Sequence, residues 1–248
     1  MSFGNRMQVL GYFARVSLQA IRRVLAMTPD ALDELLGPSE REARKRCVTL
    51  KRRTEFVGGR LAAKLAFMAA KKEHMRACTS FCLLDIPPAD GRGPKIYYLG
   101  ARVGNVSISH SGRWAAGLFY CLGAASIDIE DSVWNSKANE HFFSEFELPY
   151  IVSEKDARIR WTLKECCLKL ANLPSFEFHS AITICNGAKK WVAVTGHPDA
   201  LQDALLAVFE WGTLVASIGL LPSHTMLGTR LAGLGPAIKQ GDPCISLL

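Results

Sequence analysis

The spacing of apolar residues predicts that the first third of the chain is helical. The stretch Val9–Met27 is apolar in parts but is interrupted by three arginines, which predicts an amphipathic helix and not a signal peptide. The Thr28–Asp30 segment has N-cap and first-turn chemistry for a second helix that ends at Gly37. Ser39 and Glu42 then have the spacing of a capping box, so a third helix is expected to begin there.

A long basic helix is expected to continue from that capping box. Leu61, Leu65 and Met68 recur at helical spacing and form an apolar stripe on its later part. Because Gly58 and Gly59 interrupt the pattern, the segment is expected to be either two helices or one kinked helix.

Two groups of short apolar runs, bounded by turn residues, predict two groups of strands. After the Pro/Gly-rich loop Pro87–Pro94, the first group comprises Val106–Ser109, Ala115–Cys121 and Ser126–Glu130. Helical periodicity returns over Asn139–Leu148 and Ser153–Asn172. The second group of strands comprises Ala181–Cys185, Trp191–Val194, Leu205–Phe209 and Leu214–Ile218. After these strands, the residues from Leu231 onward are expected to form a peripheral tail.

Each half of the chain therefore runs from helices to strands. This order predicts an α+β fold, a pseudo-dimer of two similar α+β halves that meet face to face. We expect the halves to span residues 1–124 and 125–248, although no sequence repeat proves a duplication. The length of 248 residues agrees with two modest domains, since a single domain usually has about 100–150 residues.

The composition argues against a disordered or membrane-spanning chain. Hydrophobic residues make up 49% of the sequence and charged residues 21%, which is enough apolar material for a core. No nearly uncharged run reaches the roughly 18–20 apolar residues of a membrane span. The eight cysteines are scattered and no CxxC pair has a matching partner, so we expect buried thiols in a reducing cytoplasm.

Positive charge is concentrated in one segment. The net charge is +7, and Glu40–Lys72 contains eleven basic residues against three acidic ones. Such a field suits a polyphosphate-bearing small molecule, a nucleic acid or an acidic protein partner. The alternative is a solvated helix face without a ligand.

Two carboxylates alternate with isoleucines in the predicted strand Ser126–Glu130. Asp128 and Glu130 are expected on one face about 7 Å apart, with Ile127 and Ile129 on the other. Carboxylate oxygens aimed at one point suit Mg²⁺, which usually completes its coordination with water and phosphate oxygens. The alternative interpretation is an edge strand with a wet acidic face.

The predicted helix Ser153–Asn172 carries an acid flanked by cations. Trp161, Glu165 and Lys169 share one face by their spacing of four residues, and Lys164 lies beside them. Without further context, an exposed Glu165–Lys169 pair worth a few tenths of a kcal/mol explains the pattern equally well.

A turn rich in hydrogen-bond donors follows the strand Val106–Ser109. It brings hydroxyls, the imidazole of His110, the guanidinium of Arg113 and backbone amides together next to Gly112. These groups would make a good anion cradle, whereas a histidine at a strand end is also often a packing or capping residue.

The order and spacing of these segments resemble those of the surfactin-type 4′-phosphopantetheinyl transferases. The similar series, in chain order, is Ser107–Trp114, Ile127–Glu130, Phe142-Phe143-Ser144 with Glu147, and Trp161-x-x-Lys164-Glu165-x-x-x-Lys169. Upstream, Lys51–Ala63 is similar to the basic helix that precedes these motifs in the family. The resemblance covers residues 38–195.

The resemblance implies transfer of the phosphopantetheine arm of coenzyme A to a serine of an acyl or peptidyl carrier protein, with release of adenosine 3′,5′-bisphosphate. Such reactions serve fatty acid, polyketide and nonribosomal peptide biosynthesis. The resemblance also implies the 4′-phosphopantetheinyl transferase fold with the active site between the halves. We further expect a monomer with no nucleic-acid or membrane partner.

The same resemblance implies residue roles. Asp128, Glu130 and Glu165 would hold Mg²⁺ against the pyrophosphate. Glu165 would also accept the serine proton, Lys169 would contact the attacked phosphate, and Lys164 would support the phosphates. The residues implied for coenzyme A binding are His110 at the 3′-phosphate, Ser109, Arg52, Arg60, and Lys95 or the competing Arg92.

Two departures from the family pattern and two alternative functions complete the sequence-based expectations. Ser126 stands where the family usually has glycine, and Cys166 and Cys167 replace small residues after the Lys-Glu pair. One alternative is a basic nucleic-acid-binding protein, although no aromatic residues are interleaved with its cations for base stacking. The other is a family member that has lost catalysis and only binds carrier protein.

Overall fold

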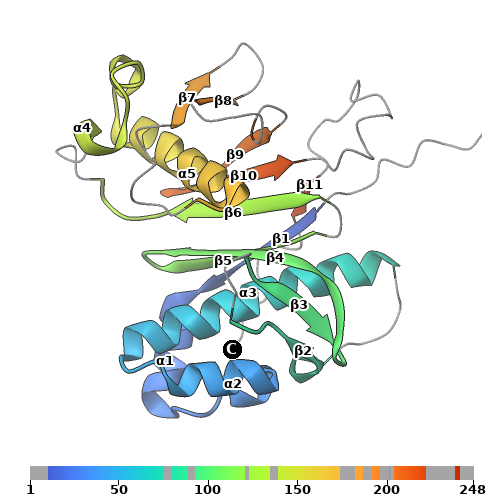
Figure 1. Cartoon of the computed structure of the whole chain (residues 1–248). Coiled ribbons are helices and arrows are strands. Elements are labelled where there is room, and N and C mark those ends of the chain that lie inside the picture. The colour runs from blue at the N-terminus through green and yellow to red at the C-terminus, as the bar shows by residue number, and fades with distance from the viewer. Residues whose placement is uncertain are drawn as a thin grey trace, which may run out of the picture.

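The chain forms two β-sheets that face each other, and helices cover the outer side of each sheet (Figure 1). Its structure is a computed structural model that describes residues 11–74, 80–88, 93–120, 123–134, 139–173, 182–186, 191–195, 201, 204–221 and 238–240. Within these ranges, none of the helices has the length and apolar character needed to cross a membrane.

The first sheet has six strands in the order β11-β1-β5-β4-β3-β2. Its helices all precede its main hairpin in the chain and pack on the side away from the second sheet (Figure 1). The elements of this layer are β1 (Gly11–Ser17), α1 (Leu18–Met27), α2 (Pro38–Lys45), α3 (Leu50–His74), β2 (Leu84–Asp85), β3 (Lys95–Tyr98), β4 (Ala101–Ser111), β5 (Trp114–Tyr120) and β11 (Ile238–Gln240).

The second sheet has five antiparallel strands in the order β6-β10-β9-β8-β7. The helix α5 packs on its outer face through a core that includes Leu163 and Leu168. The elements of this layer are β6 (Ala124–Glu130), α4 (Asn139–Phe142), α5 (Glu154–Ala171), β7 (Ile182–Asn186), β8 (Trp191–Thr195), β9 (Leu205–Trp211) and β10 (Leu214–Leu221). The α+β class and the two-halved architecture are confirmed.

A hydrophobic core fills the space between the two sheets. Phe13 and Leu118 of the first sheet pack there with Ile127, Ile129 and Ile218 of the second. Because strand side chains alternate, the isoleucines of β6 enter this core and the intervening residues face α5. The predicted alternation of the Ser126–Glu130 strand is therefore confirmed.

The structure corrects two expectations for the N-terminal third. The first part of the expected helix Val9–Met27 is strand β1, which pairs with β5 along its whole length. Ser17 then caps α1, since its hydroxyl accepts a hydrogen bond from the amide of Ala20. Thr28 ends α1 and begins no helix, and only a single 3₁₀ turn, Asp33–Leu35, precedes α2.

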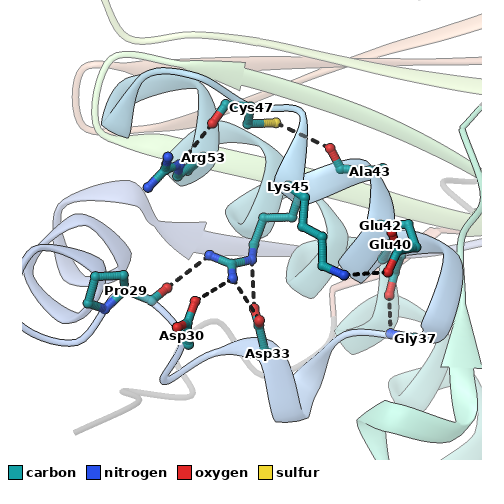
Figure 2. A network of polar contacts seen from close by, with 11 residues as sticks. Pro29, Asp30, Asp33, Gly37, Glu40, Glu42, Ala43, Lys45, Cys47 and Arg53 are labelled. Atoms are coloured by element: carbon teal, nitrogen blue, oxygen red, sulfur yellow. Dashed lines mark hydrogen bonds and ion pairs between the residues drawn. The ribbon is translucent and has the colours of Figure 1, made fainter.

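The start of α2 is held by an acid other than the expected one. Instead of a Ser39–Glu42 capping box, the amide of Gly37 donates to Glu40 Oε2 at 2.6 Å. Figure 2 shows this contact and the polar network on the other side of the helix. There the buried Arg44 forms ion pairs with Asp30 at 2.7 Å and with Asp33 at 2.6 Å. Its guanidinium also donates to the carbonyl of Pro29 at 2.9 Å.

The two glycines of α3 do not break the helix. The helix is continuous, and the missing side chains allow its neighbours to approach closely. A β-carbon at Gly58 would lie 2.4 Å from the Leu18 side chain, and one at Gly59 would lie 2.7 Å from Ile108. Gly117 of β5 faces α3 in turn, because a β-carbon there would lie 2.2 Å from the backbone nitrogen of Ala63. The expectation that the helix is interrupted at these glycines is wrong, because they serve packing; the basic segment divides instead between α2 and α3.

The two halves repeat one buried polar arrangement. Lys64 in α3 and Lys164 in α5 are both completely buried. Lys64 pairs with Glu40 at 2.5 Å, and Lys164 pairs with Glu147 at 2.6 Å. Each glutamate also accepts a hydrogen bond from the backbone amide three residues before it.

An arginine one helical turn before each lysine extends the equivalence. Arg60 donates to the carbonyl of Ile86, and Arg160 donates to the carbonyl of Ile184. The two helices therefore carry the same Arg-x-x-x-Lys pattern in the same environment, which identifies the two halves as structurally related. A pattern of five residues is too short to reveal a duplication from sequence alone.

The remaining predicted elements are reproduced with small changes. The strands of both groups are confirmed, and α5 matches Ser153–Asn172, with Ser153 as its N-cap and Asn172 as its C-cap. The helix expected over Asn139–Leu148 is the short α4 followed by turns. From the tail, residues 238–240 form β11, which pairs in parallel with β1. The domain boundary between residues 124 and 125 stays a prediction.

We expect Gly117→Ala to lower the free energy of unfolding by about 3 kcal/mol or more, because the new methyl group would meet the α3 backbone. Gly58→Ala is the control. Its methyl group would meet only a leucine side-chain tip, and alanine favours a helix by about 1 kcal/mol over glycine. Urea unfolding of both variants measures the difference, and equal losses would contradict the close backbone contact.

Candidate functional site

The candidate site is centred on Asp128, on the α5-facing side of β6. Asp128 is buried, and its Oδ1 accepts hydrogen bonds from Lys169 Nζ and Ser109 Oγ, both at 2.7 Å. Lys169 also donates to the carbonyl of Ile127 at 2.9 Å. The structure thus brings together three residues predicted for the site from three different elements: β6, α5 and β4.

Burial and the ion pair act in opposite directions on these two groups. Burial raises the pKa of Asp128, and the neighbouring Lys169 offsets only part of this rise. Burial alone would lower the pKa of Lys169, but the charge of Asp128 outweighs it, so that pKa is raised. Glu165 lies close enough to raise the pKa of Asp128 and that of Lys169. The side chain of Lys169 is 31% exposed, although its ammonium donates to both Asp128 and Ile127.

Glu130 lies two residues further along β6 and is only partly buried. Its Oε1 accepts hydrogen bonds from Ser111 Oγ at 2.5 Å, from the Ser132 amide at 2.8 Å and from the Ser132 hydroxyl. The hydrogen bonds of Asp128 and Glu130 use one oxygen of each carboxylate, Oδ1 and Oε1. The other oxygen of each has no hydrogen-bond partner in the described part of the chain.

The donor chemistry of this site fits a hard cation. Asp128 and Glu130 each offer one uncommitted oxygen, and Glu165 adds a third carboxylate within electrostatic reach of Asp128. Mg²⁺ is often held by only one or two carboxylates. Among the described residues, however, no three His, Cys, Asp or Glu side chains are already gathered as a metal cluster. The residues present therefore fit Mg²⁺ without forming a closed cage.

A second group of predicted residues lies on the opposite side of β4. The exposed His110 faces α3, where its Nδ1 lies 4.0 Å from Glu55. Arg52 lies 3.9 Å from the same carboxylate, and Lys51 is equally close. The structure thus brings His110 and Arg52 together, on the face of β4 away from Asp128.

A cavity of about 450 Å³ opens beside this second group. It lies between α1, the start of α3 and the turn that joins β4 to β5. Its charged lining residues are Arg22, Lys51, Glu55 and Arg113. Because three of these four are cations, the cavity suits an anion.

Arg60 and Lys95 lie apart from both groups. Arg60 is held inside the first half, where it donates to a backbone carbonyl, lies 3.8 Å from Glu40 and stacks over Phe56. Burial lowers the pKa of its guanidinium. Lys95 lies on β3, next to Gly93 and Pro94, which line a cavity of about 580 Å³ that Lys169 also lines. The competing candidate Arg92 lies outside the described residues.

Lys164 has a clear structural role. Its ammonium is fully buried in the pair with Glu147 and also donates to the carbonyl of Phe142 at 2.8 Å. Glu147 in turn accepts from the Ser144 amide at 2.9 Å and from the Ile184 amide at 2.9 Å. These contacts join the segment after α4 to α5 and β7. The role of Lys164 at the phosphates of coenzyme A stays a prediction. In this structure its ammonium is paired with Glu147.

The departures from the family pattern are accommodated within the core. Ser126 is buried, and its hydroxyl donates to the carbonyl of Cys166 at 2.9 Å. Cys166 and Cys167 are free, buried thiols, as expected, whereas the expectation is wrong for Cys82, which is exposed. Burial raises the pKa of both and brings that of Cys167 to about 12, so neither is a nucleophile at neutral pH.

Sequence reasoning missed the polar partners of the predicted acids. Ser111 was part of the donor-rich turn, but nothing indicated that it binds Glu130. Asp131 was not singled out, yet it pairs with Arg113 at 3.0 Å and accepts from Thr213 Oγ1 at 2.6 Å. The alternate spacing of the serines in β4 is a sequence signal that could have indicated the Ser111–Glu130 contact, whereas no such signal exists for Asp131.

Comparisons with known proteins give partial similarities of fold. No protein-family model and no curated protein matches the chain. A holo-acyl-carrier-protein synthase from Plasmodium yoelii is 17% identical and has a TM-score of 0.39, with 47% of this chain and 95% of that chain covered. The Bacillus anthracis enzyme in complex with CoA (3′,5′-ADP) is 26% identical and has a TM-score of 0.36, with 46% of this chain and 96% of that chain covered. The Neisseria meningitidis enzyme is 21% identical and has a TM-score of 0.38, with 45% of this chain and 95% of that chain covered. Each match spans less than half of this chain.

We expect Lys164→Met to lower the free energy of unfolding by about 3–5 kcal/mol, because it leaves the charge of Glu147 buried without its partner. Lys155→Met is the control, since Lys155 forms an exposed pair with Glu210 at 2.8 Å and its loss should cost about 1 kcal/mol or less. Denaturant unfolding measures both, and a Lys164 variant as stable as the control would contradict the structural role.

Proposed function

We propose that this chain is a Mg²⁺-dependent 4′-phosphopantetheinyl transferase. It would move the phosphopantetheine arm of coenzyme A to a serine hydroxyl of an acyl or peptidyl carrier protein and release adenosine 3′,5′-bisphosphate. The observation that carries the proposal is the contact of Asp128 with Lys169, with Glu165 in electrostatic reach of both. These residues come from two motifs whose order resembles that of the surfactin-type transferases.

The three carboxylates would bind the metal ion, and one of them would also act as the general base. Asp128, Glu130 and Glu165 are the residues proposed to hold Mg²⁺, and the ion would supply positive charge to offset that of the pyrophosphate. Glu165 would also take the proton from the carrier serine, because it lies on the same face of α5 as Lys169. Lys169, whose side chain is partly exposed, would contact the phosphate under attack.

The cations on the other face of β4 would bind the nucleotide end of coenzyme A. His110 is proposed at the 3′-phosphate, with Arg52 next to the same carboxylate of Glu55. Lys95 is proposed to bind coenzyme A next to the second cavity, and Arg92 stays its competing candidate from the sequence. Arg60 and Lys164 are retained only as supporting groups, because both are enclosed by protein contacts.

The distribution of charge supports an acidic protein partner over a nucleic acid. Arg44, Arg60 and Lys64 belong to the basic segment of the sequence, but each is enclosed with acidic partners. The field around α2 and α3 is therefore weaker than the sequence count suggests. Lys51 and Arg52 remain exposed at the start of α3, and exposed cations suit the acidic surface of a carrier protein.

Mass spectrometry tests the proposal directly. A panel of apo carrier proteins would be incubated with coenzyme A and Mg²⁺, and a mass gain of about 340 Da is expected on the carrier serine. Each carrier with that serine replaced by alanine is the control and should gain no mass. The proposal fails if no carrier in the panel is modified.

We expect Asp128→Asn to lower kcat/KM about tenfold or more at low Mg²⁺ and to recover part of the loss at high Mg²⁺, since weakened metal binding is a mass-action defect. Asp131→Asn is the control, because its carboxylate contacts Arg113 and Thr213 and should not alter the Mg²⁺ dependence. Initial rates measured across a Mg²⁺ series give the comparison. If added Mg²⁺ restores nothing, Asp128 is not a metal ligand.

A further inference from the structure

A row of serine hydroxyls joins the face of the first sheet to the edge of the second. Ser107, Ser109 and Ser111 alternate along β4, so all three side chains point to the same side of that strand. The strand β6 lies at the edge of its own sheet, which leaves alternate backbone amides without a strand partner. The serines occupy that edge.

Each hydroxyl replaces one missing ladder bond. The amide of Ile127 donates to Ser107 Oγ at 3.0 Å. The amide of Ile129 donates to Ser109 Oγ at 3.3 Å, and the amide of Asp131 donates to Ser111 Oγ at 3.1 Å. The acceptor advances by two residues each time the donor does, so the three contacts set one register between β4 and β6.

Two of the three serines carry a second contact. Ser109 donates its proton to Asp128 Oδ1 at 2.7 Å, and Ser111 donates its proton to Glu130 Oε1 at 2.5 Å. Ser107 contacts no carboxylate within the described residues. The row therefore contains two serines that hold a carboxylate and one that holds only the backbone.

We propose that Ser109 and Ser111 are positioning residues that orient Asp128 and Glu130 toward a divalent cation. Each hydroxyl fixes one carboxylate oxygen and leaves the other available as a ligand. This inference rests on the metal site of the proposed function. It also changes the role expected for Ser109: a hydroxyl has one proton, and that proton is committed to Asp128 and not to a phosphate of coenzyme A.

The test compares Ser111→Ala and Ser109→Ala with Ser107→Ala in the full chain. All three variants remove the acceptor of one β6 amide, but only the first two remove a carboxylate contact. Binding of Mn²⁺ as the probe cation would be followed by electron paramagnetic resonance, and the melting temperature would be recorded for each variant.

We expect all three variants to lose a similar few degrees of melting temperature, because each leaves one amide unpaired. The Kd for Mn²⁺ should rise about tenfold or more in Ser111→Ala and Ser109→Ala and change less than about twofold in Ser107→Ala. Ser111→Thr should restore the affinity, because threonine keeps the hydroxyl and suits a strand.

The outcomes separate this inference from the proposed function. An equal rise in Kd for all three alanine variants would overturn the positioning role, whether or not the wild-type chain modifies carriers. Wild-type protein that binds no Mn²⁺ would overturn it as well. A selective loss of Mn²⁺ affinity in a chain that modifies no carrier would support the positioning role and reject the transferase.

Discussion

The contact between the edge of β6 and the face of β4 is the constraint on which the rest of the structure depends. A sheet edge buried inside a protein needs partners for its amides, because an unpaired buried donor costs roughly 1–3 kcal/mol. Three serine hydroxyls supply those partners. A second β-strand would have filled the same edge but would have left no room for Lys169 to reach the carbonyl of Ile127. The hydroxyl row thus joins the halves and also contacts the two acids of β6.

The second organising feature is the pair of buried lysines. Lys64 and Lys164 each lie on the central helix of one half and bind a glutamate from the segment that packs against it. For both lysines burial lowers the pKa, and the paired glutamate offsets part of that effect. Such pairs contribute little net stability, but removing one partner is costly, so they specify how each half packs. Their shared geometry explains why a lysine inside a functional motif can have a structural role.

The chemistry of the candidate site is divided by strand β4. Its serines face β6 and the acids, whereas His110 faces α3 and the cations near Glu55. A ligand with a pyrophosphate at one end and a further phosphate at the other could contact both groups only by passing around the end of the strand. Gly112 lies at that end with a positive φ of 53°, which lets the chain turn back next to Asp131. The turn is therefore as important to the proposed site as the charged residues.

Local patterns in the sequence determined most of the strands, the extent of α5 and the placement of Asp128 opposite Ile127. These features depend on periodicity and capping, which act over a few residues and can be read along the chain. The motif order also indicated which acids and cations to consider. The local sequence did not distinguish strand β1 from a helix. The strand is stabilised by pairing with β5, whose residues lie about a hundred positions further along the chain.

Only the tertiary structure decided which charges are enclosed and which are exposed. Lys164 and Glu165 are neighbours in sequence, yet one is fully buried against Glu147 while the other lies on the face shared with Lys169. In the same way, Ser109 and His110 are adjacent but face different halves of the protein. The physical reason is that the free energy of a polar group depends on its partners and its access to water. Those partners are contributed by elements far apart in the chain, and no local pattern specifies them.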